Sequence, residues 1–146
     1  MKRGRPHRVT ALAALLSIAV LAVSDTRTLE TDTAGLLLKT MMEADGHRCA
    51  DRAVVRDDIH AIRAQVMTWV VDPQIDVILT TGGTGFSGRD VTPEALEPLF
   101  QKRMEGFSVL FHQYSSTTVG TSSLQSRATG GLIGETFVFV LPGSRG

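Results

Sequence analysis

The residues best suited to chemistry lie in a run of glycines and threonines near the middle of the chain. This run, residues 80–90, reads TTGGTGFSGRD and places four glycines within seven residues. Glycines leave backbone N–H groups unobstructed, so such a loop at the end of a strand can hold an anion such as phosphate. The alternative is a tight turn without a ligand, which needs fewer glycines than this run provides.

Two common nucleotide-binding motifs do not fit this run. Gly83, Gly85 and Gly88 match G-x-G-x-x-G, but in dinucleotide-binding folds the helix begins inside that motif, whereas the best helix start here is Thr92. Too few residues follow Gly88 for the rest of such a domain, which excludes NAD and FAD. No Lys-Ser or Lys-Thr pair follows the glycines at the spacing of a Walker loop.

Two aspartates are candidates for holding a metal ion beside a bound phosphate. Asp90 follows the glycine run, and Asp57 follows an apolar segment that ends at Val55. Carboxylates can hold Mg²⁺ next to a polyphosphate, directly or through water. The competing interpretations are a loop acid paired with Arg89, for Asp90, and a helix N-cap, for Asp57. If the two preceding strands are parallel, both carboxylates lie at one edge of the sheet.

The sequence lacks the residue patterns of histidine or cysteine metal sites and of serine-based catalysis. The four histidines have no metal-ligand spacing, and the single cysteine, Cys49, excludes an internal disulfide and a multi-cysteine zinc site. The motif G-x-S-x-G is absent, and no serine has a base at a diagnostic spacing. The chain therefore offers anion sites and carboxylates without a protein nucleophile. That combination favours binding, or phosphoryl or nucleotidyl transfer between bound substrates.

The elements that would position these residues alternate between strand and helix. The first helical pattern begins near Asp32 or Thr33 and ends at Gly46, and the second covers 59–70 after a cap at Asp57 or Asp58. A third helix is expected to begin with Thr92 as its cap, and a fourth covers 107–114. A short helix is expected at about 124–128. Strand patterns cover 17–23, 76–80 and 136–141, and a further strand ends at 53–55. The segment 136–141 is continuously apolar and is predicted to be buried on both faces of the sheet. This order predicts an α/β domain with a parallel sheet.

Length and charge narrow the class of protein further. The 146 residues are enough for one domain, and the net charge of 0 gives no basic excess for binding nucleic acid. Basic residues precede an apolar run from Val9 to Val23. That run is shorter than a membrane span of about 20 residues. Its pattern fits either the core of a secretory signal or a first buried strand.

Several of these motifs together resemble the MoaB/Mog family of molybdenum cofactor biosynthesis, over roughly residues 17–144. The resemblance rests on VSDTR at 23–27, DTAG at 32–35, TTGGTG at 80–85 with DVTPEA at 90–95, and LPGS at 141–144. The segments EGF at 105–107, GTS at 120–122 and LQSR at 124–127 are most similar to the bacterial MoaB branch.

The resemblance implies a three-layer α/β/α fold around a mainly parallel sheet. It implies a molybdopterin-binding domain over residues 17–146, after a basic extension at 1–16, and favours a strand over a signal for 17–23. The family binds molybdopterin and includes enzymes that adenylylate it with Mg-ATP; a non-catalytic binding or assembly protein is the alternative. We expect a cytoplasmic homotrimer or homohexamer with no nucleic-acid or membrane partner.

The resemblance also implies a set of site residues. Asp57 and Asp90 match the two catalytic aspartates of the family, and Asp90 is the expected magnesium ligand. The expected phosphate and pterin site comprises Ser24, Asp25, Thr81, Gly82, Gly83, Thr84, Gly85, Pro142, Gly143 and Ser144. Two features depart from the family: Arg56 replaces the proline before Asp57, and the sequence stops at Gly146, before a further family helix. We therefore expect less cover on one face of the sheet.

Overall fold

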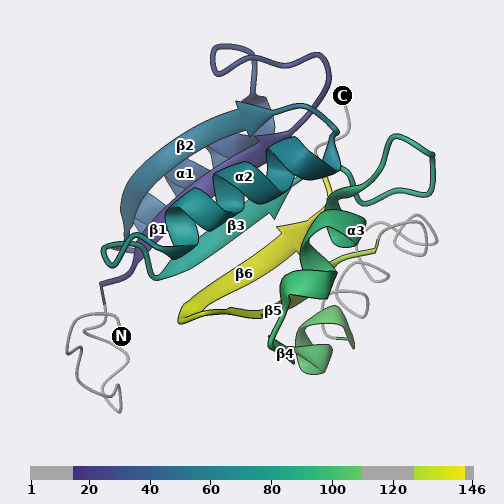
Figure 1. Cartoon of the computed structure of the whole chain (residues 1–146). Helices are drawn as coiled ribbons and strands as arrows, with labels where there is room; N and C mark the ends of the chain where they lie inside the picture. The colour runs from purple at the N-terminus through teal and green to yellow at the C-terminus, as the bar shows by residue number, and fades with distance from the viewer. Residues whose placement is uncertain (1–14, 110–126, 144–146) are drawn as a thin grey trace.

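A computed structural model describes residues 15–109 and 127–143, and a mainly parallel sheet of six strands runs through its centre (Figure 1). In the order β2-β1-β3-β6-β5-β4 the strands are Arg48–Val55, Ser17–Val23, Val77–Thr81, Thr136–Leu141, Thr129–Ile133 and Lys102–Arg103. The first four are parallel to one another, whereas β5 and β4 are antiparallel to their neighbours. The parallel strands therefore all end at the same edge.

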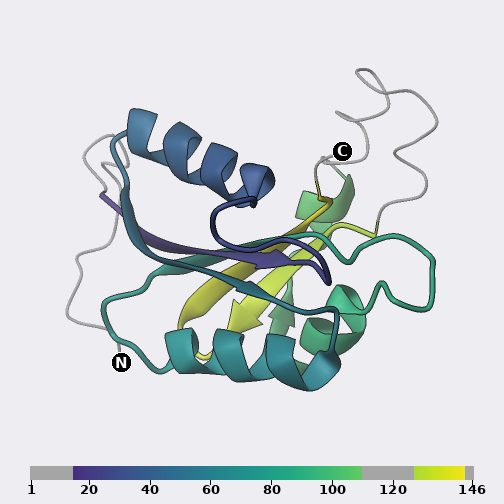
Figure 2. The ribbon, with the colours of Figure 1, turned by 90° about the horizontal axis from the view of Figure 1, so that it is seen from above.

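Helices cover both faces of the sheet, as a three-layer α/β/α fold requires. Helix α1 (Thr33–Ala44) lies on one face, and α2 (Ile59–Val70) and α3 (Thr92–Leu96) lie on the other (Figure 2). The η2 turn (Glu97–Leu99), which contains Pro98, follows α3 directly. None of the helices in the described ranges is long and apolar enough to cross a membrane.

The apolar side chains form one core on each face. On the α2 and α3 face, Ile62, Val66 and Trp69 pack with buried residues of the strands, among them Leu21, Ile78, Val138 and Val140. On the α1 face, Met42 packs with Ile18, Val20 and Val77. All seven residues of β1 are buried. The prediction that residues 17–23 form a buried strand is therefore confirmed.

The prediction that the last strand is buried on both faces is wrong. Val138 and Val140 are fully buried under α2, but Phe137 is 43% exposed and Phe139 is only partly covered. Helix α1 lies over β1 and β2, two strands away from β6, so it does not cover Phe137. Phe139 packs instead against the ring of Phe107, with the ring centroids 5.0 Å apart.

Strands β4 and β5 are absent from the predicted elements, and the short helix expected at 124–128 is not confirmed. Arg127 and Ala128 are not helical, and 124–126 lie outside the described residues. Strand β5 contains two glycines because rings pack against its backbone: a Cβ on Gly130 would lie 2.9 Å from Phe139, and one on Gly131 would lie 2.5 Å from Phe100. Of the helix expected at 107–114, only the part up to 109 is described; it begins at 105.

Candidate functional site

Four strand ends bring the predicted site residues to one edge of the sheet. The Ser24 amide, after β1, donates to the Val55 carbonyl at the end of β2 (2.8 Å). The Gly82 amide, after β3, donates to the Leu141 carbonyl at the end of β6 (3.0 Å). The loops that follow β1, β2, β3 and β6 are therefore neighbours, as the parallel arrangement predicts.

The glycine loop at 82–88 begins with a backbone that only glycine adopts easily. Gly82 and Gly83 have φ angles of +101° and +73°. A Cβ on Gly82 would overlap the Val23 carbonyl, and one on Gly83 would overlap the Thr92 hydroxyl. The loop therefore follows the end of β1 and the start of α3 as closely as a backbone can.

Thr92 anchors the loop to α3. Val91, not the predicted Thr92, occupies the N-cap position of that helix. The Thr92 hydroxyl donates to the Gly82 carbonyl (2.9 Å), and its amide donates to the Gly83 carbonyl (3.1 Å). These bonds hold two consecutive carbonyls of the loop on the α3 side.

Some amides of the loop are used within the fold and others are available. The Gly82 amide bonds to Leu141, and the Ser87 amide donates to Asp90 Oδ2 (3.0 Å). Within residues 15–109 and 127–143, the amides of Gly83 and Gly85 have no hydrogen-bond acceptor. The loop can therefore offer these two donors to an anion.

Asp57 lies beside the glycine loop and is not the helix cap. The N-cap of α2 is Asp58, whose side chain accepts from the Ala61 amide (2.8 Å). A Cβ on Gly83 would lie 3.3 Å from Asp57 Oδ1, which places this carboxylate next to the loop. Burial raises the pKa of Asp57 above its usual value, and the nearby carboxylates of Asp25 and Asp90 raise it further.

Asp90 borders the loop on its other side. A Cβ on Gly85 would lie 2.9 Å from Asp90 Oδ2. The predicted alternative, a pairing of Asp90 with Arg89, is wrong, because Arg89 reaches Asp25 instead. Its Nε and Nη2 atoms lie 2.9 Å and 2.6 Å from Asp25 Oδ2. Asp57 and Asp90 thus flank one loop, and neither is neutralised by an ion pair within the described residues.

Asp25 joins the loops that carry the two other aspartates. Its Oδ1 accepts the Asp57 amide (3.0 Å), and its Oδ2 binds Arg89. The hydrogen bonds from Arg89, followed by that from the Asp57 amide, hold the pKa of Asp25 below its usual value. No sequence pattern predicts this pair, because 64 positions separate its partners and no local spacing connects them.

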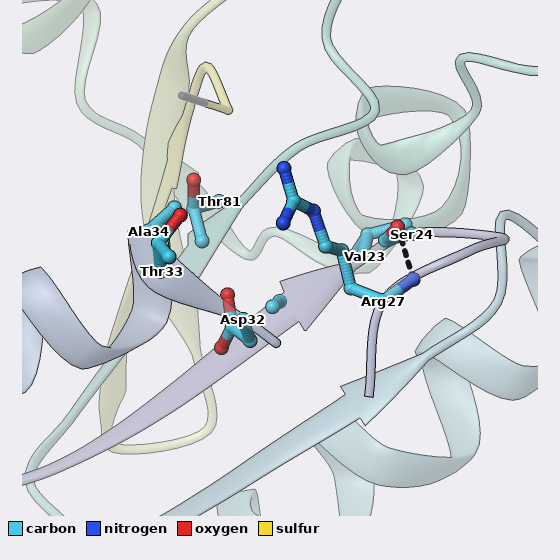
Figure 3. A pocket seen from close by; sticks show the side chains of 8 residues that line it. Val23, Ser24, Arg27, Asp32, Thr33, Ala34 and Thr81 are labelled. Atoms are coloured by element: carbon cyan, nitrogen blue, oxygen red, sulfur yellow. Dashed lines mark hydrogen bonds between the residues drawn. The ribbon is translucent and has the colours of Figure 1, made fainter. Parts of the chain in front are cut away.

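A small cavity of about 110 Å³ opens between the β1 loop and the start of α1 (Figure 3). Ser24 and Thr81, both predicted site residues, line it together with Ala22, Val23, Arg27, Asp32, Thr33 and Ala34. The Ser24 hydroxyl accepts the Arg27 amide (3.0 Å), so it shapes the turn. Arg27, Thr33 and Ala34 are not among the predicted site residues, although they belong to the two motifs that begin and end this turn.

The segment after β6 borders the glycine loop. The Pro142 carbonyl accepts the Thr81 hydroxyl (3.0 Å), and a Cβ on Gly143 would lie 3.3 Å from the Gly82 Cα. These contacts bring the predicted residues Pro142 and Gly143 to the site. Ser144 lies outside the described residues.

The acidic groups do not form a complete metal site by themselves. In the part of the chain that the structure describes, no group of three or more histidine, cysteine, aspartate or glutamate side chains is arranged to hold a metal ion. The site therefore combines two flanking carboxylates with a loop that has two amides without an acceptor in the described ranges, an arrangement suited to an anion that brings its own cation.

Comparisons with known proteins identify the family of the chain. Residues 19–146 match the family described as "Probable molybdopterin binding domain". The molybdenum cofactor biosynthesis protein B of Escherichia coli (strain K12) is 45% identical over 127 residues, which cover 87% of this chain and 75% of that protein.

Solved structures give the same result. A crystal structure of a molybdenum cofactor biosynthesis protein B aligns with a TM-score of 0.86 at 40% identity, over 90% of this chain and 82% of that one. The tungsten cofactor synthesizing protein MoaB from Pyrococcus furiosus aligns with a TM-score of 0.79 at 32% identity, over 89% and 83% of the two chains. The chain is therefore a member of the molybdopterin-binding domain family to which the MoaB proteins belong.

Proposed function

We propose that the chain acts in molybdenum cofactor biosynthesis, binds molybdopterin at the carboxyl edge of its sheet, and transfers AMP to it from Mg-ATP. The observation that carries the proposal is that Asp57 and Asp90 flank a glycine loop whose Gly83 and Gly85 amides have no hydrogen-bond acceptor among the described residues. The family match and the names of the relatives support the pathway and the pterin ligand.

The chemistry needs no nucleophile from the protein. A terminal phosphate oxygen of molybdopterin would attack the α-phosphorus of ATP, and the bond from that phosphorus to the pyrophosphate oxygen would break. The products are adenylylated molybdopterin and pyrophosphate. The protein would position two anionic substrates and reduce their mutual repulsion, which agrees with a site made of backbone donors and carboxylates.

The carboxylates fit a role beside the cation of the nucleotide. Asp57, Asp25 and Asp90 are close enough for the two other carboxylates to raise the pKa of Asp57. A divalent cation removes repulsion of this kind. Asp90 and Asp57 would therefore hold the magnesium that arrives with ATP, which neutralises phosphate charge when bound.

The second candidate is a protein that binds molybdopterin without turnover. The feature that favours this candidate is Arg56, which lies between β2 and Asp57. Arg56 replaces the proline that precedes the catalytic aspartate in the family. In either case we expect a homotrimer or homohexamer that acts in the cytoplasm, without a nucleic-acid or membrane partner.

AMP transfer distinguishes the two candidates. The purified chain is incubated with molybdopterin, ATP and Mg²⁺, and adenylylated molybdopterin and pyrophosphate are measured together with molybdopterin affinity. Formation of both products supports the transferase. Tight molybdopterin binding without product supports the binding protein, and absence of both binding and product contradicts the proposed function.

A further inference from the structure

Arg127 contacts the glycine loop from a distant part of the chain. Its backbone amide donates to the Thr84 carbonyl (3.0 Å). Its Nε lies 3.0 Å from the Gly85 carbonyl and 3.3 Å from that of Thr84, and its Nη2 donates to the Asp90 carbonyl (2.8 Å). The guanidinium also lies over the Phe86 ring, 5.5 Å from the centroid. One side chain thus holds three carbonyls on both sides of the loop tip.

These contacts fix the direction of the loop amides. In a trans peptide the C=O and the next N–H point in opposite directions, and the chain has no cis peptide among its described residues. Because Arg127 binds the Thr84 and Gly85 carbonyls, the amides of Gly85 and Phe86 point away from Arg127. These contacts therefore turn two successive donors, the Gly85 and Phe86 amides, to the same side of the loop.

The contribution of Arg127 is geometric more than electrostatic. Its Nη1 forms an ion pair with Glu94 Oε2, so the positive charge already has a partner. The remaining N–H groups form a planar fork that can bind several carbonyls at fixed angles. A lysine has a single ammonium on a flexible stem and cannot reproduce this set of contacts.

We infer that Arg127 is the positioning residue of the glycine loop, and that it turns the Gly85 and Phe86 amides toward the phosphate group of the ligand. The identity of that ligand rests on the proposed function, but the positioning does not. Strand β5 begins at Thr129, two residues after Arg127, and so fixes the place from which the side chain reaches the loop.

Amide hydrogen exchange of the ligand-free protein tests the positioning directly. The variants are Arg127→Met, which removes all the side-chain bonds, and Arg127→Lys, which keeps the charge. Since bonds to charged donors are strong, we expect exchange in segment 82–91 to be at least about tenfold faster in Arg127→Met and intermediate in Arg127→Lys. Exchange in β1 and β3 should stay within about twofold of the wild-type rate.

Two matched variants serve as controls. Arg103→Lys alters an arginine that pairs with Glu97 and Glu105 and does not contact the loop. Glu94→Gln removes the ion pair and leaves the bonds from Arg127 to the carbonyls. Exchange in 82–91 should remain close to the wild-type rate in both. An unchanged rate in Arg127→Met, or a rise spread evenly over all strands, would overturn the inference.

Anion affinity provides the second readout, with inorganic pyrophosphate as the probe and the chemical shifts of the Gly85 and Phe86 amides as the signal. We expect Arg127→Met and Arg127→Lys to bind at least about tenfold more weakly than wild type. Faster exchange with unchanged affinity would overturn the inference. If wild type itself fails to bind pyrophosphate and molybdopterin, the proposed function fails instead, and the exchange result still stands.

Discussion

Asp57 and Asp58 are adjacent in the sequence and have different environments. Asp58 caps α2 through the Ala61 amide, whereas Asp57 is turned to the glycine loop and has a raised pKa. A capping role therefore accounts for Asp58 and leaves Asp57 without a structural reason. Strained or electrostatically unfavourable groups of this kind gather at functional sites.

The two neighbours allow a matched test of catalysis. We expect Asp57→Asn to lower AMP transfer by about 10²–10³-fold, because the site loses a charge that would hold the magnesium of the nucleotide. Asp58→Asn should transfer AMP at close to the wild-type rate, because asparagine caps helices as well as aspartate does. Equal losses in the two variants would assign both residues to the stability of α2.

Asp57 also predicts how stability depends on pH. Its pKa is raised in the folded state, so ionised Asp57 destabilises the fold at neutral pH, and this effect is lost as the pH falls to the unfolded pKa of about 3.9. Asp57→Asn should therefore raise Tm at pH 7 and match wild type below about pH 4. Thermal unfolding from pH 4 to pH 8 measures this; a lower Tm in the variant at pH 7 contradicts it.

Asp90 has two roles that a single substitution can separate. Its Oδ2 accepts the Ser87 amide, and an asparagine retains an oxygen that can do the same. Asp90→Asn should therefore keep the loop in place and leave molybdopterin affinity within a few fold. AMP transfer should be abolished, because the magnesium ligand is lost. Near-normal turnover in this variant would remove Asp90 from the proposed mechanism.

Two glycines of the glycine loop, Gly83 and Gly88, differ in their surroundings. Gly83 has a φ of +73° and lies against Thr92, whereas a Cβ on Gly88 would meet nothing within 4 Å. Gly83→Ala should destabilise the fold by about 2–4 kcal/mol and weaken anion binding. Gly88→Ala should change stability by about 0.5 kcal/mol or less. Chemical denaturation of both variants measures the difference, and similar values would contradict the described loop geometry.

The elements with local sequence signals are the ones that the sequence predicts. Helix α2 has an apolar face at regular spacing and a capping aspartate, and β1 is a continuous apolar run, so both are found as expected. Strand β5 has no such signal, since its glycines reflect packing against Phe100 and Phe139. The formation of β5 therefore depends on contacts between residues that are distant in the sequence.

The same limit applies to the site. The positions of Asp57 and Asp90 follow from parallel strands ending at one edge, which a sequence pattern can predict. The partners of Arg89 and Arg127 lie 64 and about 40 positions away in the chain, and only the folded arrangement brings them together. Sequence patterns therefore identify Asp57 and Asp90, which we propose face the ligand, but not the contacts of Arg89 and Arg127 with distant parts of the chain.

On the scale of the whole molecule, we expect several copies to assemble. Large apolar side chains are exposed on the described surface, among them Leu37 and Met41 of α1, at 57% and 58%, and Phe137 of β6. Association would remove such groups from water. Sedimentation velocity at micromolar concentration should give a trimer or a hexamer, and a single monomeric species at all concentrations would contradict this.

The strand order has a consequence for how the protein is made. Strand β6 follows the other five strands of the described sheet in the sequence, yet it lies between β3 and β5 near the middle of the sheet. A ribosome therefore releases β2, β1 and β3 long before the strand that joins them to the antiparallel pair. Until then β3 has an unpaired edge of five residues that other nascent chains could pair with. The Gly82 amide finds its Leu141 partner only after β6 has been synthesised, so the loop closes when this strand joins the sheet.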